Sequence, residues 1–220
     1  MTTSNLAAWH VVLPVKRRDS AKTRLGAHEI AREALALAFA TDTMRAVLAC
    51  PQVGELVVVT EDETVAAHAR TLGASVVAES HSPDVRGFAR LNQAIEQGIT
   101  ARGLDDEPVA ALTADLPALR PSELTAALEA AAGHTRALVP DHTGTGTSMV
   151  SAMRGSLLDP AFGLASADAH LRSGAVLLDV AAPGLRLDVD LPDDLRTALE
   201  LGCGEATTAL LARVTPASES

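Results

Sequence analysis

The chain has 220 residues, of which 47% are hydrophobic and 21% charged, a balance typical of a globular protein with a packed core. Its formal net charge of -10 and its aromatic content of only 2% argue against a nucleic-acid-binding surface. No apolar run approaches the ~18 residues that a membrane span needs, and residues 1–10 lack the pattern of a secretory leader. Two cysteines without a CxxC spacing argue against zinc and disulfide frameworks, so we expect a cytoplasmic protein.

The length predicts one domain over residues 1–220, with residues 215–220 as a disordered tail. Apolar runs predict strands over residues 11–15, 55–60, 74–78, 108–113, 136–140, 148–153, 175–180 and 185–190. Helical periodicity and capping residues predict helices over residues 29–50, 61–72, 88–101, 167–172, 192–201 and 205–214, and one beginning at Pro121. This order predicts a three-layer α/β/α sandwich with a mixed, mainly parallel sheet and an antiparallel addition in the second half.

A basic loop follows the first predicted strand. Residues 16–24 contain five cations and only one acid, Asp19, in an otherwise acidic chain. The cations are Lys16, Arg17, Arg18, Lys22 and Arg24. Because the loop leaves the carboxyl end of a buried strand, where open α/β sheets bind ligands, we predict that it binds a polyphosphate. The alternative interpretation is a solvated run of charge.

Three aspartates lie at or near the ends of later predicted strands. Asp115 comes directly after the strand over residues 108–113, whereas Asp188 and Asp190 are two apart on the last strand, which places both carboxylates on one face. Carboxylates from two strand ends can converge on Mg²⁺, which proteins commonly hold with one or two carboxylates while substrate phosphates supply other ligands. Helix capping is the alternative role for Asp115 and Asp190, because Asp is a preferred N-cap residue.

A Gly/Thr loop spans Thr143-Gly-Thr-Gly-Thr147. Its backbone N–H groups and hydroxyls have the makings of an anion nest, although an ordinary hairpin connection explains it equally well. No P-loop motif is present, and Met149 stands where a dinucleotide fingerprint needs its third Gly. A long polar loop over residues 79–87 also lies at the expected ligand face. Together with the basic loop and the carboxylates, these features indicate two anions bridged by magnesium, as in phosphoryl or nucleotidyl transfer.

An ordered series of motifs resembles the phosphoenolpyruvate or 2-phospho-L-lactate guanylyltransferases of deazaflavin coenzyme 420 biosynthesis. The motifs follow that family's order from about residue 11 to about residue 205. They are Leu13-Pro-Val-Lys16, Ala21-Lys-Thr-Arg-Leu25, Asp115-Leu-Pro117, Gly144-Thr-Gly-Thr147, Phe162-Gly163 with Ser166, His170, Ser173-Gly-Ala175 and Leu187-Asp-Val-Asp190.

The resemblance implies a nucleotidyltransferase fold of the GT-A type and the transfer of GMP from GTP to the phosphate of phosphoenolpyruvate. The products would be enolpyruvyl-diphospho-guanosine and pyrophosphate, and the anionic phosphate would attack without a general base. It implies that the catalytic cations on the GTP phosphates are Lys16, Lys22 and Arg24, with Asn92 on the nucleoside. It implies that the residues binding phosphoenolpyruvate are Thr147, Gly163 and Ser166. It implies that the ligands of Mg²⁺ are Asp115, Asp188 and Asp190.

Several alternatives stay open beside this resemblance. The acceptors 2-phospho-L-lactate and 3-phospho-D-glycerate differ from phosphoenolpyruvate by too little to separate from sequence, and Ala114 and His142-Thr143 depart from the family's pattern near the acceptor motifs. A sugar or cofactor nucleotidyltransferase is a second alternative, although such enzymes normally begin with a glycine-rich loop instead of Pro14-Val-Lys-Arg17. A catalytically silent nucleotide-binding domain is a third. The next enzyme of the pathway is a further expected partner, and the oligomeric state is not predicted.

Overall fold

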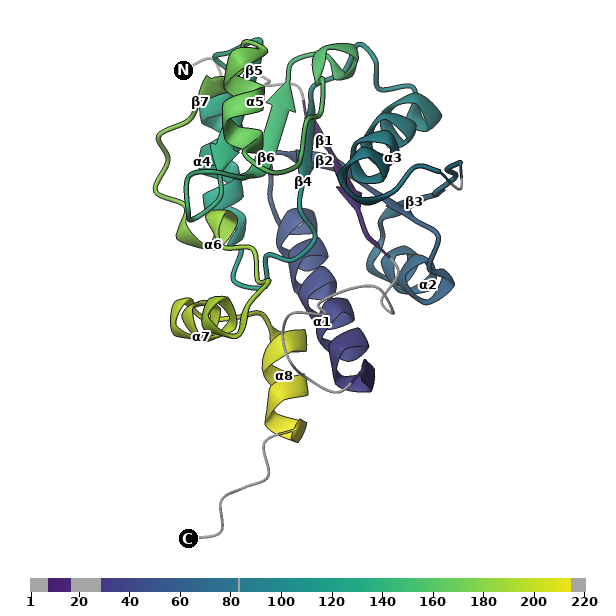
Figure 1. Ribbon diagram of the computed structural model, residues 1–220, viewed down its shortest axis with the longest axis vertical. Helices are drawn as coiled ribbons and strands as arrows, with labels where there is room; N and C mark the ends of the chain where they lie inside the picture. The colour runs from purple at the N-terminus through teal and green to yellow at the C-terminus, as the bar shows by residue number, and fades with distance from the viewer. Residues whose placement is uncertain (1–7, 17–28, 83, 215–220) are drawn as a thin grey trace, which may run out of the picture.

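A computed structural model describes residues 8–16, 29–82 and 84–214 (Figure 1). Its strands are β1 (Trp9–Pro14), β2 (Val53–Thr60), β3 (Ser75–Ala78), β4 (Val109–Leu112), β5 (Arg136–Pro140), β6 (Thr147–Ala152) and β7 (Val176–Leu177). Its helices are α1 (Glu29–Leu48), α2 (Glu63–Leu72), α3 (Gly87–Arg102), α4 (Pro121–Ala131), α5 (Ser166–Arg172), α6 (Pro183–Arg186), α7 (Pro192–Leu201) and α8 (Glu205–Val214), with a 3₁₀ turn, η3 (Gly155–Leu157).

The seven strands form one sheet in the order β3-β2-β1-β4-β6-β5-β7. Strands β1 to β4 are parallel to their neighbours among themselves, and β6 runs antiparallel to both β4 and β5. The continuous apolar run in β1 suits its central place, because a parallel strand is buried on both faces. The predicted mixed, mainly parallel sheet with an antiparallel addition in the second half is therefore confirmed.

Helices cover both faces of this sheet, which gives the three predicted layers (Figure 1). Val11 and Leu13 of β1 belong to the same buried cluster as residues of α1, α2 and α4. Val12, which points to the opposite face, belongs to a cluster with residues of α3. Asp42 of α1 also accepts hydrogen bonds from the backbone N–H groups of Ala206 and Thr207, both at 2.9 Å, which joins α1 to the start of α8.

Helix α3 lies directly on the sheet at Gly98. A Cβ atom at this position would lie 2.8 Å from Val59 Cγ2 and 2.9 Å from Val12 Cγ1, closer than carbon atoms pack without a bond between them. The missing side chain therefore lets the helix rest on β1 and β2. The N-terminal half of α3 carries residues that line both cavities described below.

The strand predicted over residues 185–190 is wrong. Pro183 begins the short helix α6, where its missing N–H costs no hydrogen bond, and residues 187–190 follow outside any helix or strand. Leu185, Leu187 and Val189 are all buried, so their alternation reports burial and not sheet pairing. The strand predicted over residues 175–180 is also reduced, to the two residues of β7.

In the described ranges, no helix combines the length and the apolar character that crossing a membrane requires.

Candidate active site

Two cavities meet at the carboxyl end of β1, and Pro14, Val15 and Lys16 line both of them. The first, which we call the arginine cavity, has a volume of about 500 Å³ and is also lined by Glu79, His81, Arg86 and Arg90. The second, which we call the carboxylate cavity, has a volume of about 230 Å³ and is also lined by Phe88, Thr113, Asp115, Asp188 and Asp190. Their common wall lies where open α/β sheets bind ligands.

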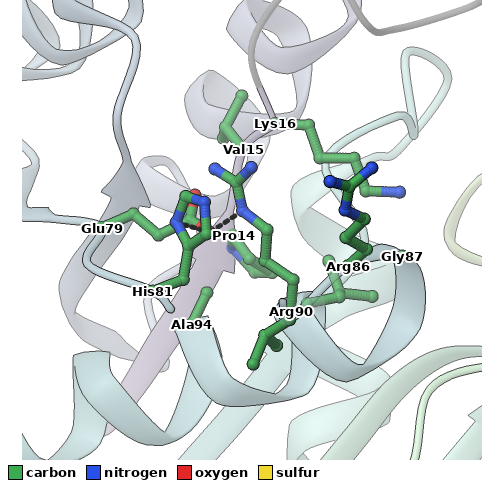
Figure 2. A pocket seen from close by; sticks show the side chains of 11 residues that line it. Pro14, Val15, Lys16, Glu79, His81, Arg86, Gly87, Arg90 and Ala94 are labelled. Carbon is green, nitrogen blue, oxygen red and sulfur yellow. Dashed lines mark hydrogen bonds and ion pairs between the residues drawn. The ribbon is translucent and has the colours of Figure 1, made fainter. Parts of the chain in front are cut away.

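The charged groups of the arginine cavity are paired with one another (Figure 2). The Arg90 guanidinium donates from Nε to Glu79 Oε1 at 2.5 Å, and its Nη2 lies 2.8 Å from Glu61 Oε1. The hydrogen bond to Glu79 is the main reason why the pKa of Arg90 is raised above its usual value. The Glu79 side chain is only 6% exposed, and His81 Nδ1 lies 3.9 Å from its Oε1. This wall of the cavity is therefore fixed before any ligand arrives.

The carboxylate cavity gathers like charges. The backbone N–H of Val189 donates to the carbonyl oxygen of Asp115 at 3.0 Å, which holds the segment carrying Asp188 and Asp190 against the end of β4. Burial raises the pKa of Asp188 to about 7, and the negative charges of Asp115 and Asp190 add to the rise. His142 Nδ1 lies 3.7 Å from Asp188 Oδ1. The three predicted carboxylates thus face one space.

The fit of a metal ion to this cavity follows from its chemistry. Carboxylate oxygens are the ligands that hard cations prefer, and a cation would offset the repulsion that raises the pKa of Asp188. Within the described part of the chain, no three or more His, Cys, Asp or Glu side chains form a complete metal-binding group. The carboxylates therefore suit an ion that takes further ligands from a substrate or from water.

Lys16 is the member of the basic loop that the structure places. Its ammonium lies 6.0 Å from the centre of the Phe88 ring, at the wall that the two cavities share. Lys22 and Arg24, like Arg17 and Arg18, lie outside the described residues. The predicted polyphosphate role of the loop therefore has a structural position for Lys16 alone.

The three residues predicted to bind the acceptor come from neighbouring elements. Thr147 begins β6 and Ser166 begins α5, and both are buried. The backbone N–H of Ala167 donates to the Thr145 carbonyl oxygen at 3.1 Å, which joins the two elements. Gly163 lies close to Phe88, because a Cβ atom on it would be 3.6 Å from Phe88 Cγ. None of the three lines either cavity, although Phe88 connects them to the carboxylate cavity.

The Gly/Thr loop connects β5 to β6 as a hairpin, the second of its two interpretations. Asp141 Oδ1 accepts hydrogen bonds from the Thr145 backbone N–H at 3.1 Å and from the Thr143 hydroxyl at 2.9 Å. The Gly144 N–H donates to the Asp141 carbonyl oxygen at 3.1 Å, and Gly144 has a φ of 77°, which favours glycine. The loop's own carboxylate thus uses donors that an anion nest would offer.

Asn92 forms a two-way hydrogen-bonded link with the loop that carries Gly163. Its Nδ2 donates to the Phe162 carbonyl oxygen at 3.0 Å, and its Oδ1 accepts from the Phe162 N–H at 2.9 Å. Asn92 lines neither cavity, so its contact with the nucleoside stays a prediction.

The sequence did not single out Glu79, Arg86, Arg90 or Thr113, which line the cavities. The unusual length of the polar loop over residues 79–87 was the available signal for the first two. Arg90 sits within a helix and carries no signal of its own. Thr113 has a buried hydroxyl that makes no hydrogen bond within the described ranges, and only its position after β4 hinted at the site.

Comparison with known proteins gives a family match over almost the whole chain. The model of the family described as "Guanylyl transferase CofC like" matches residues 9–214. A phosphoenolpyruvate guanylyltransferase of Geodermatophilus obscurus is 49% identical over 211 residues, covering 93% of this chain and 94% of the relative. The enzyme of the same name from Salinispora arenicola is 49% identical over 212 residues, covering 94% and 95%.

Solved structures with low sequence identity share the fold. A putative nucleotide-diphospho-sugar transferase of Desulfovibrio desulfuricans has a TM-score of 0.67 at 16% identity, covering 94% of this chain and 95% of its own. A 4-diphosphocytidyl-2C-methyl-D-erythritol synthase has a TM-score of 0.61 at 13% identity, covering 89% and 99%. A Mycobacterium tuberculosis protein solved in complex with manganese has a TM-score of 0.51 at 18% identity, covering 88% and 98%. The likeness confirms the nucleotidyltransferase type of fold.

Proposed function

Because the chain belongs to the Guanylyl transferase CofC like family, we propose that it transfers GMP from GTP to the phosphate of phosphoenolpyruvate. The names of its relatives from Geodermatophilus obscurus and Salinispora arenicola support this acceptor. The observation that carries the proposal is the placement of three carboxylates and Lys16 around one cavity at the carboxyl end of β1. The reaction would take place in a single cytoplasmic domain.

The reaction needs charge control more than proton transfer. A phosphate oxygen of phosphoenolpyruvate attacks the α-phosphorus of GTP, a new P–O bond forms, and the bond to the β-phosphate oxygen breaks to release pyrophosphate. Because the attacking oxygen is already anionic at neutral pH, no side chain has to remove a proton. The protein's task is therefore to hold two polyanions in line and to offset their charge.

Asp115, Asp188 and Asp190 are the residues proposed to hold Mg²⁺. The bound ion would neutralise charge on the phosphates of both substrates. The raised pKa of Asp188 supports this assignment, because a nearby cation would favour its ionised form. The manganese complex of the structurally similar Mycobacterium tuberculosis protein also supports a divalent ion.

The arginine cavity is the proposed site of the guanosine. Its volume of about 500 Å³ lies within the ~300–1,000 Å³ usual for small-ligand pockets. Glu79 and Arg90 present an acceptor and donors to the polar edge of a purine, and Asn92 stays a further candidate for this contact. The triphosphate would then reach Lys16 at the common wall, with Lys22 and Arg24 as the other proposed phosphate ligands.

The acceptor is proposed to bind at Thr147, Gly163 and Ser166. Their elements are joined by hydrogen bonds and approach the carboxylate cavity through the contact of Gly163 with Phe88. The acceptors 2-phospho-L-lactate and 3-phospho-D-glycerate would use the same carboxylate and phosphate contacts, so the experiment has to compare all three.

The experiment incubates the purified chain with GTP and Mg²⁺ plus each of the three acceptors and measures pyrophosphate release. Mass spectrometry of the product identifies what has received GMP. A parallel series includes the enzyme that consumes the product, because slow product release would hide turnover. We expect the highest kcat/KM with phosphoenolpyruvate. Silence with every acceptor in both series would overturn the proposed function, and a preference for another acceptor would overturn the choice of phosphoenolpyruvate.

A further inference from the structure

His170 of α5 forms a buried hydrogen-bonded link beside the proposed acceptor site. Its side chain is fully buried, and its two ring nitrogens face different partners. Nε2 lies 2.9 Å from the backbone nitrogen of Ala161, and Nδ1 lies 3.0 Å from Thr147 Oγ1. A backbone N–H can only donate, so Nε2 must accept. In a neutral ring the hydrogen then lies on Nδ1, which must donate to Thr147 Oγ1.

The surroundings keep this ring neutral. Burial lowers the pKa of His170 to about 4, and the charge of Arg136 lowers it further, while Asp159 acts in the opposite direction. Arg136 is itself fixed, because it donates to the carbonyl oxygens of Leu158, Asp159 and Ser173 at 2.8 to 3.1 Å. At neutral pH the imidazole therefore carries a single hydrogen, and the bond from Ala161 decides where it lies.

This arrangement determines the direction of the Thr147 hydroxyl. A hydroxyl has one hydrogen to donate, and Oγ1 already accepts from His170. In the described ranges, Thr147 Oγ1 makes no second hydrogen bond, so its hydrogen remains available for a ligand. Resting on the proposed function, we propose that His170 is a positioning residue that makes Thr147 a dedicated hydrogen-bond donor to the anionic acceptor.

The same imidazole also ties down the loop that carries Gly163. Ala161, whose N–H it accepts, is followed by Phe162, whose ring lies edge-on to the imidazole with centroids 5.6 Å apart. The backbone of Phe162 is held from the other side by Asn92. One buried side chain thus couples two of the three residues proposed to bind the acceptor, Thr147 and Gly163.

Two substitutions separate the two halves of this link. In His170→Asn the amide nitrogen can still donate to Thr147, whereas in His170→Gln the amide oxygen can still accept from Ala161 but the donor to Thr147 is lost. We expect His170→Gln to raise the KM for phosphoenolpyruvate about tenfold, with the KM for GTP unchanged, and His170→Asn to raise it less. Adding Thr147→Val to His170→Gln should cost nothing beyond Thr147→Val alone.

A matched control is available in α2. His68 Nε2 lies 3.0 Å from Thr41 Oγ1, a histidine–threonine pair that lines neither cavity. His68→Gln should leave the KM for phosphoenolpyruvate unchanged. An unchanged KM in His170→Gln, or full additivity with Thr147→Val, would overturn the proposal.

A second measurement tests the proposal without catalysis. Long-range ¹H–¹⁵N NMR of the full chain should show His170 as the Nδ1–H tautomer, and the Nε2–H tautomer would overturn the proposal whatever the activity. Calorimetric binding of phosphoenolpyruvate separates the two claims further. A chain that binds phosphoenolpyruvate but never transfers GMP contradicts the proposed function alone. Unchanged binding by His170→Gln contradicts the role of His170 alone, and no binding by the unsubstituted chain contradicts both.

Discussion

The arginine cavity and the carboxylate cavity share a wall but accommodate charge in opposite ways. In the arginine cavity, Glu79 and Arg90 form a hydrogen-bonded pair with almost no exposure of the glutamate. In the carboxylate cavity, Asp188 lies beside two further aspartates, and the pKa of its carboxyl group is raised to about 7. Paired charges stabilise the protein before a ligand binds, whereas clustered like charges destabilise it until a cation arrives. The first cavity is built for shape and hydrogen bonding, and the second for a metal ion with phosphates.

The sharpest way to break this comparison is Asp188→Asn. Loss of a metal ligand should lower kcat/KM for GMP transfer by on the order of 10²–10³-fold. The free energy of unfolding without metal should rise by about 1 kcal/mol, because the substitution removes a buried charge that its neighbours repel. Steady-state kinetics and chemical denaturation measure the two effects.

The control for Asp188→Asn is Asp193→Asn in α7, where the exposed carboxylate lies 2.9 Å from Arg196 Nη2 and lines neither cavity. It should change neither quantity. Retained activity together with lower stability in Asp188→Asn would contradict the assignment of the carboxylate cavity.

Lys16 tests whether one ligand spans both cavities. Lys16→Met should lower kcat/KM for GTP about 10²-fold, because the ammonium would offset phosphate charge at the common wall. Lys16→Arg should recover part of the loss. Arg154→Met removes an exposed cation that pairs with Asp106 at 3.0 Å and should have no effect on kcat/KM. Equal losses in Lys16→Met and Arg154→Met would mean that net charge, and not position, is what matters.

Arg90→Leu tests the paired cavity and should change stability in the direction opposite to Asp188→Asn. It leaves Glu79 buried without its guanidinium, so the free energy of unfolding should fall by about 2 kcal/mol. The KM for GTP should rise severalfold, while kcat stays close to its original value. Joint replacement of Glu79 and Arg90 by leucine should restore stability but not the KM. If Arg90→Leu stabilised the chain, the contrast between the cavities would disappear.

A third way of accommodating a buried titratable group, keeping it neutral, gives the smallest effect. The folded pKa of His170, about 4, lies below the unfolded value of about 6.5. The unfolded chain therefore binds more protons, and stability that is full above about pH 6.5 is lost as the pH falls towards 4. Between about pH 7.5 and about pH 5.5 this loss should reach about 1 kcal/mol. Denaturation curves of the protein and of His170→Gln should differ in pH dependence by that amount, and identical pH profiles would contradict it.

Local patterns were sufficient to predict the sheet, because buried parallel strands appear as continuous β-branched runs such as residues 55–60. They were also sufficient for Asp115, which follows such a run directly. The alternation over residues 185–190 misled because a segment can bury every second side chain without pairing as a strand. In the structure, the hydrogen bond from Val189 to Asp115 does what the predicted strand was expected to do, and it brings Asp188 and Asp190 to the same cavity.

Contacts between distant residues lay beyond the sequence. Glu79 and Arg90 meet because α3 lies over the end of β3, and nothing in the residues between them fixes that geometry. His170 was recognised only as part of a motif, since its link to Thr147 depends on how α5 packs beside β6. Sequence periodicity predicts which face of an element is buried, whereas the side chains that meet across two elements depend on how those elements are placed.

The close seating of α3 at Gly98 has a consequence for how this protein can diverge. With no side chain between the helix and Val12 or Val59, the height of α3 above the sheet is set by core packing and not by its flanking loops. Arg86, Arg90 and Leu91 therefore project into the arginine cavity from a frame of fixed spacing. Nucleobase preference can then drift through single exchanges on this helix surface while the catalytic distances stay the same. Selection for a new nucleotide would act there long before it reshaped the fold.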